Sequence, residues 1–175
     1  RDHPLFPTKV NYYSTKGDKM KIGLYTLTPG KLQTLFPEVG YPQFRFAQRL
    51  YKVFGDAWIE RALEVSASGG YKELGNKAGY GNKSVIEALL IKLQHLSPEI
   101  YPLSNYNFID DVIRNIIEGV TCLIDISGLT AEEQHRIVTL TASNVAFYYK
   151  HMWESDHEKW QKLPTLLITL EEAHE

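Results

Sequence analysis

The chain has 175 residues, 19 of them basic and 21 acidic, which gives a formal net charge of −2. This length predicts one domain-sized globular unit, and the balanced charge excludes a basic field over the whole molecule, so any nucleic-acid binding requires a local patch. No apolar run approaches the roughly 20 residues that span a bilayer, and the single cysteine, Cys122, cannot form an internal disulfide. We expect a cytoplasmic protein without a membrane segment.

The first forty residues, 1–40, are expected to form a sheet-associated segment with loops. Residues 1–20 contain two prolines and a Lys-Gly-Asp turn, a composition that favours irregular surface chain. The run KIGLYTLTP, residues 21–29, is rich in β-forming side chains and is followed by glycine after its final proline. We therefore predict a short strand there that joins a sheet.

Residues 41–118 are predicted to be a helical insertion. Apolar side chains from Phe44 to Leu63 recur at steps of three and four, which indicates one apolar face on a helix, and Gly55 is a candidate break. The sequence NFIDDVIRNIIEG predicts a further helix that begins after Asn107 and ends at its final glycine. We interpret the aromatic residues at helical spacing as core packing.

A helix-turn-helix pattern stands inside this insertion, at residues 71–96. Small residues and a turn glycine fall where two helices would make close contact, and Ser84 with Glu87 predicts a capping box for the second helix. Lys77 and Lys83 could then face DNA phosphates. Two interpretations are open: a unit that contacts DNA, and a pair of packed helices without that role.

Residues 119–175 are predicted to contain a βαβ unit. Val120–Ile126 is expected to be a strand buried on both faces, and Thr130 with Glu133 predicts a capping box at the start of a long helix. The five apolar or β-branched residues Leu166–Leu170 predict a second buried strand. A right-handed crossover would make the two strands parallel near neighbours.

The carboxyl ends of these two strands carry polar side chains. Parallel strands end at the same edge of a sheet, where α/β proteins bind ligands, so Asp125 and Ser127 should lie near Glu171 and Glu172. Asp125 could order water at a site, or it could satisfy the amide groups of its own turn. Both interpretations are open.

The connector at residues 151–164 contains histidine and acidic side chains that could suggest a metal site. These are His151, Asp156, His157 and Glu158. Their spacing matches no helical metal-binding motif, so we predict a solvated loop instead.

The last residues of the chain carry the most specific motif. The apolar run ends in Glu171 and Glu172 followed by Ala-His, which resembles the Walker B segment of P-loop ATPases. In its EEAH form the motif is most similar to the HerA family of hexameric DNA translocases. The order of a β-prone segment, a helical insert, the run VTCLIDISGLTAEEQHRIV and the closing LLITLEEAH is similar to the central part of these ATPases. The resemblance covers most of the chain.

This resemblance implies an α/β fold, a partial RecA-like P-loop ATPase sheet with a large helical insertion. It implies ATP and Mg²⁺ as cofactors, with Glu172 as catalytic base and Glu171 supporting Mg²⁺ directly or through water. His174 would relay the state of the nucleotide to neighbouring elements. The implied partners are DNA, further copies of the chain in a hexameric ring, and a nuclease or other effector protein.

The chain contains no Gly-x-x-x-x-Gly-Lys-Ser/Thr sequence, so the loop that cradles phosphates is absent from it. We therefore interpret it as an internal segment of a larger ATP-dependent DNA helicase or translocase and expect this segment alone to be inactive. The alternative is a non-catalytic, helix-turn-helix-like module that binds DNA or serves as a scaffold.

Overall fold

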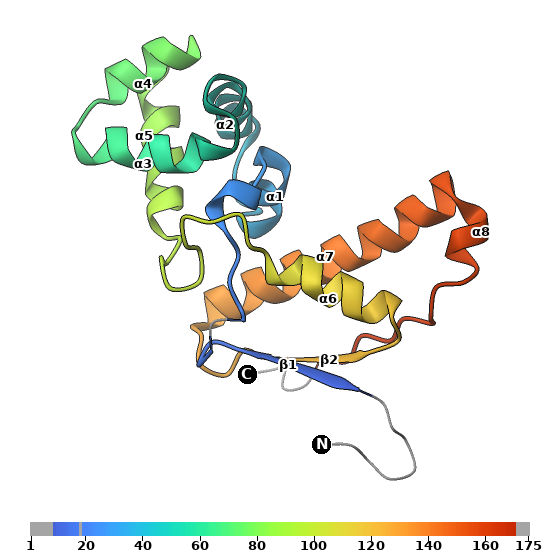
Figure 1. Cartoon of the computed structure of the whole chain (residues 1–175). Coiled ribbons are helices and arrows are strands. Elements are labelled where there is room, and N and C mark those ends of the chain that lie inside the picture. The colour runs from blue at the N-terminus through green and yellow to red at the C-terminus, as the bar shows by residue number, and fades with distance from the viewer. Residues whose placement is uncertain (1–8, 18, 171–175) are drawn as a thin grey trace. The chain divides into compact units, whose positions relative to one another are not determined.

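The computed structural model describes residues 9–17 and 19–170 (Figure 1). The chain divides into two compact units: Arg1–Gly17 and Ile109–Glu175 form unit 1, and Asp18–Phe108 forms unit 2. Unit 2 is thus inserted into unit 1 along the sequence. The described residues form helices and a two-stranded parallel sheet, which confirms the predicted mixed α/β class.

Unit 2 is built mainly of helices. The apolar stripe from Phe44 to Leu63 forms two helices that separate at Gly55, whose φ of 59° is a conformation that glycine adopts without strain. The pattern at residues 71–96 also forms two helices. In chain order the elements are η1 (Leu24–Thr26), α1 (Pro29–Leu35), α2 (Tyr41–Phe54), η2 (Gly55–Ala57), α3 (Trp58–Ala67), α4 (Tyr71–Ala78) and α5 (Lys83–Gln94).

The core of unit 2 consists of the apolar faces of its helices. Trp58 is fully buried, and its Nε1 atom donates to the carbonyl oxygen of Leu27 at 2.8 Å, so the polar atom of this large side chain is satisfied. Its burial agrees with the interpretation of this aromatic residue as packing. Other buried side chains of the core are Phe46, Ala47, Leu50, Ile59, Ala62, Leu74, Ile86, Leu89, Leu90 and Leu93.

The chain enters and leaves unit 2 through adjacent backbone segments, residues 21–23 and 106–108, which we call the neck. An antiparallel bridge joins Ile22 and Asn107, and backbone hydrogen bonds of 2.6 and 2.9 Å flank it. These bonds pair backbone groups that would otherwise need water or another partner. The neck therefore holds the first and last residues of the insertion next to each other.

The strand predicted over residues 21–29 is wrong beyond the bridge at Ile22. The chain turns into η1 directly after it, and the hydroxyl of Thr28 then caps α1 by accepting from the amide of Lys31 at 3.3 Å. Pro29 is the first residue of α1, where a missing N–H costs nothing. The proline that follows this β-prone run therefore begins a helix and does not end a strand.

Unit 1 contains the sheet and a long helix. β1 (Val10–Ser14) and β2 (Thr121–Asp125) are parallel neighbours, with Val10 opposite Thr121 and Ser14 opposite Asp125. In Figure 1, α6 and α7 lie on one side of this strand pair. The helices are α6 (Phe108–Ile117), whose first residue closes unit 2, α7 (Ala131–Ser155) and α8 (His157–Trp160).

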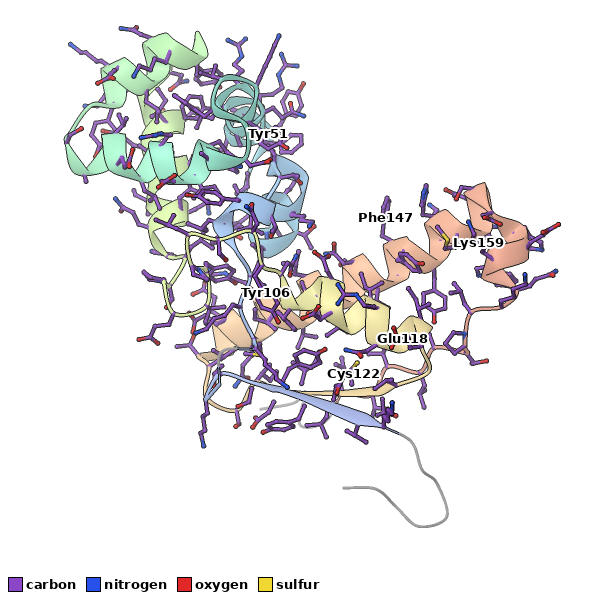
Figure 2. All side chains as sticks on the ribbon, viewed as in Figure 1. Tyr51, Tyr106, Glu118, Cys122, Phe147 and Lys159 are labelled. Carbon is purple, nitrogen blue, oxygen red and sulfur yellow. The ribbon has the colours of Figure 1, made fainter. Side chains whose placement is uncertain are left out.

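The sheet differs from the predicted one in its partner and in its burial. β1 falls in the segment predicted to be irregular, and β2 agrees with the predicted strand Val120–Ile126. Burial of β2 on both faces is wrong, because Leu123 is exposed, as are Val10 and Tyr12 on β1. The opposite face is covered: the Sγ atom of Cys122 lies 3.8 Å from the carbonyl oxygen of Val112 on α6 (Figure 2).

The long helix α7 begins as predicted and ends later than predicted. Thr130 Oγ1 accepts from the amide of Glu133 at 3.3 Å, and the Glu133 carboxylate accepts from Thr130, so the predicted capping box is confirmed. The helix continues to Ser155, into the predicted connector. Among the residues described, no helix combines the length and apolar character that a membrane crossing requires.

The segment Leu166–Leu170 is not a strand in the described structure, contrary to the prediction. It has no assigned regular structure, and Leu167, Ile168 and Leu170 are 86%, 48% and 59% exposed. A strand needs a hydrogen-bonded neighbour, and the described sheet consists of β1 and β2 alone. The prediction that Leu166–Leu170 forms the second strand of a βαβ unit is therefore wrong. The described residues do not form a RecA-like sheet.

The neck should be sensitive to added volume at Gly23. A Cβ atom built there would lie 2.0 Å from the carbonyl oxygen of Ser104, which is backbone and cannot rotate away. We expect Gly23→Ala to lower the free energy of unfolding by about 2 kcal/mol or more, as overpacked sites do. Urea denaturation measures this change.

Gly81→Ala is the matched control, because a Cβ atom at Gly81 meets nothing within 4 Å. It should change the free energy of unfolding by less than about 1 kcal/mol. Equal stability of the two variants would contradict the close approach of backbone segments in the neck.

Candidate functional site

The carboxyl edge of the β1–β2 pair brings together side chains from two distant parts of the chain. Ser14 and Asp125 are register partners at the last position of each strand, so the turns that follow both strands leave the same edge. Ligands of α/β proteins bind at such edges. This edge is the candidate site that the described residues support, and the sequence-predicted Asp125 and Ser127 both belong to it.

The carboxylate of Asp125 accepts hydrogen bonds from β1 and from the turn that follows β2. Its Oδ1 atom accepts from the amide of Ser127 at 3.0 Å and from the hydroxyl of Ser127 at 2.7 Å. Its Oδ2 atom accepts from the hydroxyl of Tyr12 on β1. Asp125 thus accepts from an amide of its own turn, as one of the two open interpretations predicts. It also connects β2 to β1 through the Tyr12 hydrogen bond.

These hydrogen bonds favour the charged form of the Asp125 carboxyl. The Tyr12 hydroxyl first, and then the two Ser127 donors, lower its pKa from 3.8 to about 2. The same contact raises the pKa of the Tyr12 phenol, because ionised tyrosine could not donate to the carboxylate. The edge therefore carries a fixed negative charge at neutral pH.

The turn after β2 packs closely on the turn after β1. A Cβ atom at Gly128 would lie 2.8 Å from Thr15 Oγ1, so a glycine at this position allows the two turns to approach each other.

The carboxylate of Asp125 has room for a further hydrogen bond. A carboxylate oxygen can accept two hydrogen bonds, and Oδ2 of Asp125 accepts one from Tyr12. The edge can thus accept one further donor, such as a water molecule.

Sequence reasoning did not identify Tyr12 as part of this edge. The residue lies 113 positions before Asp125, in a segment predicted to be irregular, so no local pattern connects the two. The local signal was the β-branched and aromatic residues Val10, Tyr12 and Tyr13, which are types enriched in strands.

The three other residues predicted for the catalytic site, Glu171, Glu172 and His174, lie outside the described residues. The structure therefore neither brings them to Asp125 nor separates them from it. Among residues 9–17 and 19–170, no group of three metal-ligating side chains is assembled.

The predicted solvated loop after residue 150 is largely helical instead. Asp156 caps α8 by accepting from the amide of Lys159 at 3.1 Å, and it also pairs with the Lys159 ammonium at 2.8 Å. His157 packs against Trp153 and Trp160, with ring centroids 4.4 and 5.3 Å away. Aromatic packing between the end of α7 and α8 thus explains the extra helix, because it gives this short segment a contact surface.

The helix pair α4–α5 has the close packing that the helix-turn-helix pattern predicts. Gly79 ends α4 in the left-handed conformation, with φ of 60°. A Cβ atom at Gly75 would lie 2.6 Å from the carbonyl oxygen of Tyr80 and 3.0 Å from Ile86 Cδ1, so the turn folds directly onto α4. A compact turn of this kind fits either open interpretation of the pair.

The capping box predicted at Ser84 and Glu87 is wrong. Asn82 is the N-cap of α5, and its Oδ1 atom accepts from the amide of Val85 at 3.3 Å. Ser84 lies inside the first turn, where its hydroxyl donates to Asn82 Oδ1 at 2.8 Å. An asparagine two residues earlier thus fills the capping role, which asparagine performs as well as serine.

Both candidate DNA-contacting lysines of this pair form exposed ion pairs within their own helices. Lys77 pairs with Glu73 at 2.6 Å, and Lys83 pairs with Glu87 at 3.5 Å. Exposed pairs of this kind contribute at most about 1 kcal/mol. A phosphate could displace either carboxylate, but each glutamate reduces the local positive charge.

The hydrogen bond from Tyr12 should be measurable through the titration of Asp125. We expect Tyr12→Phe to raise the pKa of Asp125 from about 2 towards 3.8, as carboxyl NMR shifts would report. Because the folded pKa is depressed, the stability that the charged form supplies is complete above about pH 4. It is lost as the pH falls towards 2.

Tyr51→Phe is the control, because Tyr51 makes a comparable 3.0 Å hydrogen bond to Asp56 in unit 2. It should leave the pKa of Asp125 unchanged. An unchanged pKa of Asp125 in Tyr12→Phe would contradict the edge geometry described above.

Similarity to known proteins adds no further constraint on this site. No family model, no curated protein and no solved structure matches the chain. The assignment of a function therefore depends on the residues of this chain and on their geometry.

Proposed function

We propose that this chain is a segment of an ATP-dependent DNA translocase or helicase related to the HerA-type P-loop ATPases. The observation that carries the proposal is the run of apolar residues that ends in Glu171 and Glu172 and then Ala-His. Two adjacent acids after such a run suit phosphoryl transfer, which depends on positioning and electrostatics more than on covalent chemistry.

Unit 1 supports the proposal through its parallel strands. Parallel sheets occur almost only where helices cover both faces, whereas the face of β1 and β2 with Val10, Tyr12 and Leu123 is exposed. A two-stranded sheet is also marginal by itself. These features fit a piece of a larger α/β sheet.

The proposed chemistry is hydrolysis of ATP by an oriented water molecule. Glu172 would orient the water and accept its proton, and Glu171 would support Mg²⁺, which prefers oxygen ligands. Bound Mg²⁺ would neutralise charge on the phosphates. The phosphate-binding loop must come from other residues of the intact protein, because its motif is absent from this sequence.

The proposal includes the partners that such motors use. The intact protein would form a ring, hexameric as in the HerA family, in which hydrolysis moves DNA through a central channel. A nuclease or another effector would use that movement. His174 would transmit the state of the nucleotide, and Asp125 with Ser127 would border the nucleotide site.

Substitution of the two glutamates in the intact protein tests the proposal. Glu172→Gln should keep ATP affinity near normal and reduce turnover by about 10²–10⁴-fold, because an amide of almost equal volume cannot accept the proton. Steady-state hydrolysis and nucleotide binding, measured on the same sample, separate the two effects.

Glu171→Gln is the matched comparison at the neighbouring position. Loss of a group that supports Mg²⁺ should weaken Mg-ATP binding as well as turnover. The assigned roles are wrong if Glu172→Gln retains more than about a tenth of normal turnover. They are also wrong if Glu171→Gln loses turnover while its Mg-ATP binding stays normal.

A second candidate function, a non-catalytic DNA-binding module, is favoured by the distribution of charge. Unit 2 contains 11 Lys and Arg against 8 Asp and Glu, a net charge of +3. Unit 1 contains 8 against 13, a net charge of −5. The excess of basic residues thus lies in the unit that carries the α4–α5 pair, and a local patch is what the balanced overall charge requires.

The lysines of the α4–α5 pair test this second candidate. If they contact phosphates, Lys77→Ala combined with Lys83→Ala should weaken DNA binding and reduce the slope of log affinity against log salt by about 1.8. Salt titrations of the intact protein measure the slope. Unchanged binding would indicate that α4 and α5 are only a packed pair.

A further inference from the structure

Helix α2 carries positive charge without any compensating acid of its own. Its 14 residues, YPQFRFAQRLYKVF, include Arg45, Arg49 and Lys52 and no aspartate or glutamate. At 100° per residue, these three side chains leave the helix within an arc of about 60°. The residues of this arc are exposed. We call them the α2 basic face.

The α2 basic face is directed away from the core of unit 2. Phe46, Ala47 and Leu50, which are fully buried, occupy the opposite side of the helix. The packing of that apolar side fixes the rotation of α2, so the basic face is held outward by the fold. Arg45 and Lys52 are seven residues apart, a separation of about 10 Å along the helix axis.

The contacts of these side chains leave their charges uncompensated. Arg45 donates to the Tyr41 hydroxyl at 3.1 Å, and its guanidinium lies 5.8 Å from the Tyr41 ring centroid. Arg49 donates to the carbonyl oxygen of Gly79 and lies over the ring of Tyr80. Both sets of partners are neutral, so they orient the guanidinium groups and do not neutralise their positive charge.

Other basic side chains of unit 2 differ in this respect. Arg61, Lys77, Lys83 and Lys92 each lie within 3.5 Å of a carboxylate oxygen. Among the described residues, no ion pair is formed by Arg45, Arg49 or Lys52, and the acid that follows α2, Asp56, accepts from Tyr51. Three basic side chains without an ion pair among the described residues thus lie together on one helix face.

The α2 basic face adjoins the turn of the α4–α5 pair. Arg49 contacts Gly79 at the end of α4, and the Tyr80 hydroxyl donates to the carbonyl oxygen of Pro42 at 3.3 Å. A shallow hollow of about 300 Å³ is lined by Pro42 and Gln43 of α2 and by Ser84, Val85 and Ala88 of α5. α2 and α5 thus both border this hollow.

We propose that the α2 basic face binds the phosphate backbone of double-stranded DNA, with the turn between α4 and α5 beside it. Charge complementarity identifies the partner as a polyanion, and the choice of DNA rests on the proposed function. Arginine and lysine in fixed positions on one helix face contact phosphates without reading sequence. Their separation of about 10 Å is larger than the 3.4 Å rise per phosphate along the duplex axis, so the two side chains can contact different phosphates.

The test compares the wild-type chain and a double variant that combines Arg45→Gln and Lys52→Gln. Fluorescence anisotropy of a labelled 20-base-pair duplex measures the binding of each over a series of salt concentrations. We expect the double variant to bind at least about tenfold more weakly at 50 mM salt. Its negative slope of log affinity against log salt should become less steep by about 1.8, because each phosphate contact that is lost removes the release of about 0.9 counterions. Arg49 is left in place because it connects α2 to α4.

Two controls separate this surface from a general effect of charge. Lys9→Gln combined with Lys162→Gln removes the same charge from exposed positions of unit 1 and should bind like the wild type. Arg45→Lys combined with Lys52→Arg keeps both charges and should bind within about threefold of the wild type, since a phosphate contact depends on charge.

Three results would overturn the inference: no duplex binding by the wild-type chain, wild-type binding by the Arg45→Gln, Lys52→Gln variant, or equal weakening in the unit 1 control. Each is a result about DNA binding alone. ATP turnover in the Glu172→Gln experiment decides the proposed function separately, so the two can fail independently.

Discussion

The parallel pairing of β1 with β2 is the constraint on which the rest of unit 1 depends. It joins Val10 to Thr121 and Ser14 to Asp125, across the whole length of unit 2. Closing so long a loop costs conformational entropy, although the cost grows only slowly with length. The neck reduces the effective length, because its backbone hydrogen bonds bring the two ends of the insertion together. The sheet can therefore form once unit 2 has folded.

The same pairing creates the polar edge at Asp125. Two parallel strands that end at the same level place Tyr12 where its hydroxyl reaches a carboxylate 113 residues later in the chain. The resulting charge is stable at neutral pH because three donors surround it. A site border of this kind needs no loop rearrangement to be ordered, which suits a position beside the proposed nucleotide site.

Charge is divided between the two units of the chain. Unit 2 has a net charge of +3 and unit 1 a net charge of −5, although the chain as a whole is nearly neutral. The division agrees with a working hypothesis in which the insertion contacts DNA while unit 1 contributes carboxylates to phosphoryl transfer. Within unit 2, Lys77 and Lys83 form ion pairs on α4 and α5, whereas α2 carries three basic residues and no acid.

The sequence by itself determined the helices of the insertion from α2 onward and the start of α7, because their apolar period and caps are local: Gly55 separates α2 from α3, and Thr130 with Glu133 begins α7. It also determined β2 and the presence of Asp125 at its end. Only the tertiary structure decided that β1 exists, that Tyr12 holds Asp125, and that Leu166–Leu170 forms no strand among the described residues. Strand pairing depends on which distant backbone is available as a partner, and no local pattern of side chains contains that information.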